Sequence, residues 1–118
     1  MTPEQLKRRT KNFGLGVIQL LSTLPRSTVN DVIGRQLIRS ATSVGANYRA
    51  ACRARSANDF VAKMKIVEEE ADESVYWLEM LVESGSITAE SACDLLREGN
   101  ELVAIVVASI KTKRLQQI

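Results

Sequence analysis

Apolar residues recur every three or four positions along most of this chain, and this helical period constrains the possible folds more than any other feature. No run alternates with a period of two for long enough to form a strand. Aromatic residues make up only 4% of the chain, which is typical of helices rather than strands. The clearest stripe comprises Phe60, Met64, Val67, Ala71, Ser74, Leu78 and Leu81. The pattern predicts an all-α protein.

Capping and turn residues divide the chain into four helical segments. Thr2 and Gln5 form a capping box, whereas Pro25 and Gly85 end helices. Counted from the first capping residue to the last turn, the segments span about 2–24, 27–53, 56–83 and 88–114. Short connections favour an antiparallel up-and-down four-helix bundle. Because 118 residues are too few for a second core, we expect one domain over residues 1–118.

The composition excludes several kinds of chemistry. Histidine is absent, which removes His-based catalysis and nearly all zinc chemistry. The two cysteines, Cys52 and Cys93, show no metal-ligand spacing. The N-terminus has no signal-peptide core, and the longest apolar run, 102–108, is too short to span a membrane. We therefore expect a cytoplasmic protein with reduced thiols and no cofactor, metal or catalytic residue.

The third segment carries a second apolar stripe outside its main one. This stripe contains Ile66, Trp77 and Met80, with Tyr76 beside them. A helix in a monomeric bundle buries one stripe and exposes the rest to water, so a second stripe marks a partner surface. We infer that Ile66, Trp77 and Met80 form an oligomer interface. The alternative is that broad stripes wrap a wide monomeric core.

Polar residues interrupt the apolar faces of the second and third segments. Asn47 falls on an apolar seam, and Glu70 and Glu73 fall beside the second stripe. We expect a buried polar network in which Arg39, Asn47, Glu70 and Glu73 are hydrogen-bonded. The candidate arginine partners are Arg35, Arg39 and Arg49. Clustered carboxylates can instead serve acid–base catalysis or a di-metal site, but the Glu-x-x-His pairs of di-iron bundles are excluded.

Charge is unevenly distributed along the chain. Residues 1–65 carry a net charge of +9 and residues 66–118 carry −7, although the total is only +2. Two basic clusters stand out. The first contains Lys7, Arg8, Arg9 and Lys11, and the second contains Arg49, Arg53 and Arg55. From them we select as nucleic-acid-binding candidates Lys7, Arg8, Lys11, Arg49 and Arg53. No aromatic residue interleaves with the cations, so any contact would be to phosphates. The alternatives are a solvated face or neutralisation by the acidic half.

The second and third segments together resemble a known family. Residues 37–47, the pair Asp59-Phe60, residues 69–73 and residues 76–81 are similar to proteins encoded in intervening sequences of 23S ribosomal RNA genes. The resemblance implies a left-handed up-and-down bundle and a ring-shaped homopentamer with a central channel. Related accessory proteins of diversity-generating retroelements bind nucleic acid and a reverse transcriptase. The polar positions that match the family are Arg39, Ser43, Asn47, Glu70 and Glu73.

Three hypotheses follow from the sequence. The first is a non-enzymatic, oligomeric module whose basic clusters form a ring that contacts RNA or DNA phosphates. The second is a structural or protein-partner adaptor in which the charged halves neutralise each other across subunits. The third, an enzyme that uses the carboxylate cluster, has the least support. The positions of the basic residues in the folded chain separate the first two hypotheses.

Overall fold

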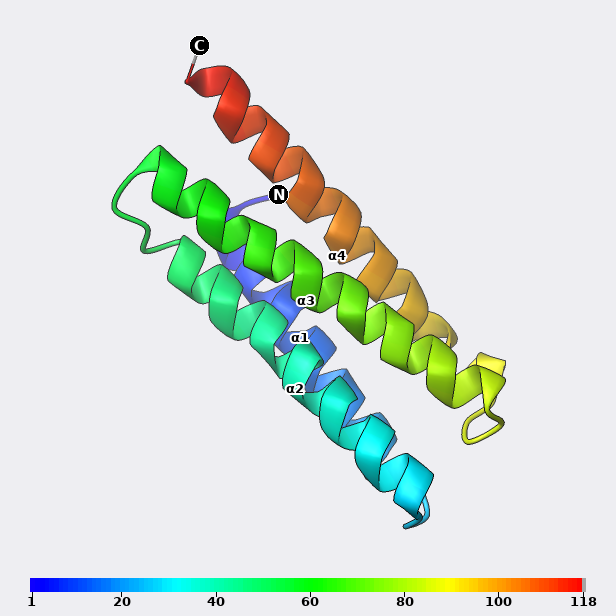
Figure 1. Cartoon of the computed structure of the whole chain (residues 1–118). Helices are drawn as coiled ribbons and strands as arrows, with labels where there is room; N and C mark the ends of the chain where they lie inside the picture. The colour runs from blue at the N-terminus through cyan, green and yellow to red at the C-terminus, as the bar shows by residue number, and fades with distance from the viewer. Residues whose placement is uncertain (118) are drawn as a thin grey trace.

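Four helices run alternately up and down beside one another in the computed structural model, which describes residues 1–117 (Figure 1). They are α1 (Pro3–Leu21), α2 (Thr28–Ala51), α3 (Ala57–Glu83) and α4 (Ala89–Gln116). The bundle measures 50 × 21 × 20 Å, and the described part of the chain contains no strand. The prediction of an all-α, antiparallel four-helix bundle is confirmed.

A hydroxyl side chain begins each helix. In every case its oxygen accepts a hydrogen bond, 3.0–3.1 Å long, from the backbone N–H three residues later. The four capping residues are Thr2, Ser27, Ser56 and Thr88. After α3, Gly85 adopts a φ of 84°, which glycine tolerates best. α1 ends at Leu21, a few residues before the expected end, because a turn at 22–24 precedes Pro25.

All four helices contribute to one continuous apolar core. Phe13 of α1, Leu37 of α2, Met64 of α3 and Leu102 of α4 are all fully buried or nearly so. Each such side chain contributes roughly 1.5–3 kcal/mol through burial. The apolar stripe that the sequence predicted in α3 lies in this core, except that Phe60 is only half-buried.

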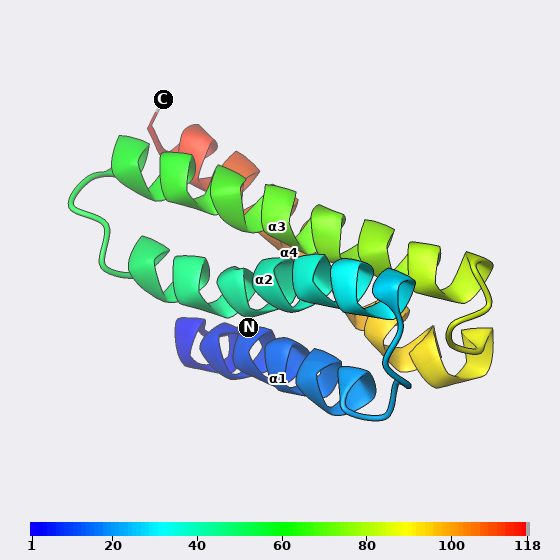
Figure 2. The same cartoon turned by 60° about the horizontal axis from the view of Figure 1, so that its bottom comes forward.

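The two N-terminal helices approach each other unusually closely. A Cβ atom at Gly14 would lie 3.4 Å from the carbonyl oxygen of Ala41, and one at Gly45 would lie 3.3 Å from the carbonyl carbon of Thr10. A Cβ at Gly14 would just fit in van der Waals contact, whereas one at Gly45 would require the α1 backbone to shift by a few tenths of an ångström, so small residues bring α1 and α2 together. Figure 2 shows α1 alongside α2 over its whole length.

A helix that spans a membrane must be both long and strongly apolar. Among residues 1–117, none of the four helices is both long enough and apolar enough to cross a bilayer.

Candidate nucleic-acid interface

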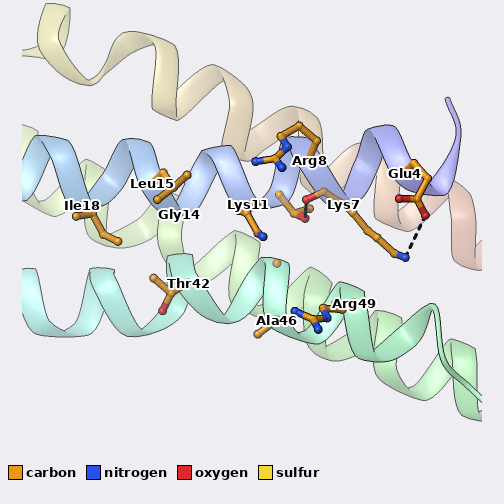
Figure 3. Close-up of a pocket in the computed structure, with 12 residues that line it drawn as sticks. Glu4, Lys7, Arg8, Lys11, Gly14, Leu15, Ile18, Thr42, Ala46 and Arg49 are labelled. Carbon is orange, nitrogen blue, oxygen red and sulfur yellow. Dashed lines mark hydrogen bonds and ion pairs between the residues drawn. The ribbon is translucent and has the colours of Figure 1, made fainter.

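A groove of about 600 Å³ runs along the outer side of the α1–α2 pair (Figure 3). It lies directly above the close approach of the two helices. Its lining residues are Glu4, Lys7, Arg8, Thr10, Lys11, Gly14, Leu15, Ile18, Thr42, Gly45, Ala46 and Arg49. Four of the five nucleic-acid-binding candidates are in this set, so the fold brings together residues that lie up to 42 positions apart in sequence.

Small residues form the floor of the groove. Gly14 and Gly45 leave the two backbones in near contact, and Ala46 adds only a methyl group. The buried hydroxyl of Thr10 donates within α1, with carbonyl acceptors at Leu6 and Lys7 at 2.9 and 3.0 Å. The floor is therefore hollow and has no buried polar side chain that requires a ligand, so the polar groups available to a ligand stand on the walls.

Cations make up the walls at one end of the groove. Figure 3 shows Lys7 and Lys11 extending from α1 toward α2, and Arg49 standing on α2. Lys7 pairs with Glu4, with a distance of 3.2 Å between Nζ and Oε1. Within residues 1–117, Arg8, Lys11 and Arg49 form no ion pair. One acidic and four basic side chains thus share the lining, and the groove carries a positive charge.

Arg53, the fifth candidate, does not line the groove. It lies in the turn after α2, where the chain already leads toward α3. Arg53 therefore lies outside the groove that contains Arg49, and its part in nucleic-acid binding stays a prediction.

Arg9 belongs to the first basic cluster in sequence but faces the opposite side of α1. Its guanidinium makes two hydrogen bonds to the carboxylate of Glu98, and its Nη2 lies 3.4 Å from Oε1 of Glu101. The hydrogen bonds to Glu98 raise the pKa of Arg9 above its ordinary value. Arg9 is therefore neutralised against α4 and unavailable to the groove, which the sequence alone did not indicate.

Charge is separated along the length of the bundle. The half that contains the cationic end of the groove, residues 1–12, 41–70 and 102–117, holds twelve basic and five acidic residues, a net charge of +7. The other half, residues 13–40 and 71–101, holds four basic and nine acidic residues, a net charge of −5. Antiparallel packing has therefore turned the charge asymmetry of the sequence into a basic end and an acidic end.

The polar residues expected in a buried network lie at the rim between α2 and α3. Arg39 pairs with Glu73, and its Nη1 lies 3.4 Å from Oε2 of Glu70. However, the side chains of Arg39 and Glu73 are 49% and 36% exposed. Asn47 is half-buried, and its side chain makes no hydrogen bond within the described chain. The predicted pairing of the arginine with the two carboxylates is present, and Glu70 is largely buried, with 19% of its side chain exposed. The expectation of burial is wrong for Arg39, Asn47 and Glu73 in the single chain.

Two serines occupy the buried position between α2 and α3 instead. The hydroxyl of Ser74 donates to the hydroxyl of Ser40 over 3.0 Å, and both residues are fully buried. Because these side chains are small, the longer charged ones stay outside at the helix rim. In α2, Tyr48 rather than Asn47 turns into the core.

The expected oligomer interface lies on the outer face of α3. Ile66 and Met80 are 44% and 38% exposed, and Tyr76 beside them is also exposed. Trp77 is half-buried; its Nε1 donates to Glu73 over 3.1 Å, and the edge of its ring packs against Tyr76. A single chain thus leaves an apolar face uncovered, which is where a second subunit was expected.

A family model and a solved structure both match this chain over most of its length. The family model described as 23S rRNA-intervening sequence protein matches residues 5–108. A crystal structure of a protein of unknown function from the S23 ribosomal protein family of Bacteroides thetaiotaomicron is similar, with a TM-score of 0.83. The two sequences are 33% identical, and the similarity covers 89% of this chain and 97% of that one. No curated protein matches the chain.

Proposed function

The chain belongs to the 23S rRNA-intervening sequence protein family, and from this premise we propose that it is a non-enzymatic, oligomeric protein that binds RNA or DNA phosphates. The groove between α1 and α2 is the proposed binding site. The observation that carries the proposal is the convergence of Lys7, Arg8, Lys11 and Arg49 on one groove, three of them without an ion pair among residues 1–117.

Charge placement supports this proposal over simple neutralisation. Where the fold neutralises cations, it does so within the chain, as with Arg9 against Glu98 and Arg39 against Glu73. Of the groove cations only Lys7 has such a pair, with Glu4, whereas Arg8, Lys11 and Arg49 are gathered at the basic end without one among residues 1–117. Gathering like charges is unfavourable unless a ligand offsets the repulsion. A nucleic-acid backbone carries one negative charge at each nucleotide and can do so.

The groove chemistry predicts how such binding behaves. The cations reach phosphate oxygens but no aromatic side chain lines the groove for stacking, so affinity depends on charge and varies little with base sequence. Each neutralised phosphate releases condensed cations, so affinity falls steeply as salt increases.

Assembly would strengthen a weak contact. We propose that the outer face of α3, with Ile66, Trp77 and Met80, packs between subunits, and the family resemblance implies a pentameric ring. A ring repeats the groove on every subunit, and one strand that reaches several grooves gains avidity without new contacts. The exposure of Ile66, Tyr76 and Met80 on α3 supports the assembly.

A binding titration on material of known mass tests the proposal. Fluorescently labelled RNA and DNA oligonucleotides are titrated at low salt with wild-type protein, the Lys7→Glu/Lys11→Glu variant and the Lys111→Glu/Arg114→Glu variant. The latter removes two cations outside the groove. We expect binding to be lost only in the first variant, because reversal of exposed charges changes stability little. If wild-type protein binds neither polymer at low salt, the adaptor function replaces this proposal.

The adaptor is the second candidate, and the separation of charge along the bundle favours it. The basic end of one molecule is complementary to the acidic end of another, or to an acidic partner protein. In that case both variants above would change the assembly rather than any affinity for nucleic acid.

A further inference from the structure

The α1–α2 groove has two chemically different ends. Beyond the cations it continues along Leu15 and Ile18 of α1, which are 46% and 41% exposed. Figure 3 shows both side chains on the groove, on the far side of Lys11 from Lys7. A purely electrostatic phosphate site has no use for two exposed aliphatic side chains at its end.

From this pairing we infer that the groove receives an unpaired nucleic-acid strand, with successive phosphates at the cations, among them Lys7, Lys11 and Arg49, and an unpaired base against Leu15 and Ile18. The inference rests on the proposed function and specifies the kind of nucleic acid. Two features of the groove carry it: the spacing of its residues along α1 and the chemistry of its two ends.

The spacing along α1 suits adjacent parts of one nucleotide chain. Lys7, Lys11, Leu15 and Ile18 follow one another at intervals of four, four and three residues, so they lie on one face of the helix. The rise from Lys11 to Leu15 is about 6 Å. A phosphate held by Lys11 therefore leaves its neighbouring sugar and base within reach of the aliphatic pair, without any rearrangement of the helix.

The chemistry of the ends separates a single strand from a duplex. In a duplex the faces of the bases are stacked and covered, and the outside presents phosphates, which would lose water against Leu15 and Ile18 without gaining a partner. An unpaired strand exposes base faces that pack on side chains whatever the base. The aliphatic end thus adds affinity for an unpaired base, and the cationic end adds affinity for any strand.

Three ligands of equal length test this inference: a short labelled oligouridylate, a duplex, and an abasic strand that keeps the phosphates but lacks bases. The variant Leu15→Ser/Ile18→Ser removes the aliphatic end. Its matched control, Val29→Ser/Val32→Ser, removes two aliphatic side chains, each 53% exposed, from α2 outside the groove. Both proteins are checked for mass by light scattering and for helicity by circular dichroism.

We expect the groove variant to bind the oligouridylate about tenfold more weakly than wild-type protein, since it loses two aliphatic contacts. Its affinity for the abasic strand, and the salt dependence of its affinity for the oligouridylate, should be unchanged, because no cation is lost. The control should bind all three ligands as wild-type protein does. The wild-type protein should prefer the oligouridylate to the duplex.

Equal affinity for the duplex and the oligouridylate, with a silent groove variant, would overturn the inference while leaving the proposed function intact. A groove variant of lower mass than the wild-type oligomer would also overturn it, because Leu15 and Ile18 would then be a contact between copies of this chain. If wild-type protein binds none of the three ligands, the proposed function itself fails.

Discussion

The backbone of Lys11 packs against Gly45, so that a Cβ atom at position 45 would lie 3.3 Å from the backbone nitrogen of Lys11. This contact joins the fold to the proposed site. The missing side chain at Gly45 lets α1 lie against α2, and the same close approach forms the floor beneath the side chains of Lys11 and Arg49. A residue that serves packing therefore also sets the shape of the groove.

Alanine at position 45 should destabilise the bundle. Gly→Ala inside a helix normally stabilises a protein by up to about 1 kcal/mol, through propensity. At Gly45 the added methyl meets the backbone of Thr10 and Lys11, and we expect a net loss of about 1 kcal/mol. Gly34 on the same helix is the control, because its Cβ would meet only the Leu21 side chain, at 3.5 Å. Urea unfolding that shows equal stabilisation of both variants would contradict the tight crossing.

Much of the fold could be predicted from local signals. The capping hydroxyls mark where helices begin because the bond they make is formed within one turn. The rotation of α2 about its own axis was not predictable at the same precision. Whether Asn47 or Tyr48 faces the core depends on how Gly45 packs against α1. That packing is a contact between residues distant in sequence, so local patterns do not show it.

Adjacent arginines on α1 should have separable roles. Arg9→Met leaves Glu98 without its partner, and since both side chains are about three-quarters buried we expect a loss of roughly 1–2 kcal/mol of stability. Arg8→Met should change stability by less than about 0.5 kcal/mol but weaken oligonucleotide binding. Thermal unfolding and a binding titration on both variants check this. Equal effects of the two substitutions in both assays would contradict the assignment of Arg9 to the α4 contact.

Acid should loosen the start of α3. Asp59 accepts hydrogen bonds from Lys63 Nζ and from the backbone N–H of Arg55, at 2.6 and 3.2 Å, and these lower the pKa of Asp59 below its ordinary 3.8. A carboxyl whose pKa is lower in the folded state stabilises the fold above its unfolded pKa. That contribution is lost as pH falls from 3.8 through the lowered value. Asp59→Asn should therefore make the free energy of unfolding depend less on pH below pH 3.8. Urea unfolding at several pH values would refute this if the variant and the wild-type protein lost the same stability in acid.

The sequence indicated which residues could form the candidate site, but not how they would be arranged on the surface of the folded chain. Lys7, Arg8 and Lys11 share a helix face, and that spacing was enough to group them. The addition of Arg49 and the departure of Arg9 to Glu98 depend on which helices become neighbours. The aliphatic end at Leu15 and Ile18 went unnoticed because exposed leucine and isoleucine are common on any helix.

The outer face of α3 should control assembly. Ile66→Glu/Met80→Glu places two charges on the proposed interface, and we expect a monomer with unchanged helicity, because both positions are exposed in the single chain. Val29→Glu/Val32→Glu, on the exposed face of α2, is the control and should keep the wild-type mass. A wild-type protein that is monomeric at micromolar concentration would end the assembly proposal.

The salt dependence of binding tests the central claim most directly. With an oligonucleotide short enough to occupy one groove, four cations predict a slope of about −3 in a plot of log affinity against log salt for wild-type protein. Replacing Lys11 and Arg49 with glutamine should reduce the magnitude of that slope by about 1.4, whereas Lys111→Gln/Arg114→Gln should leave it unchanged. A wild-type slope near zero, or the same slope in both double variants, would contradict phosphate binding in the α1–α2 groove.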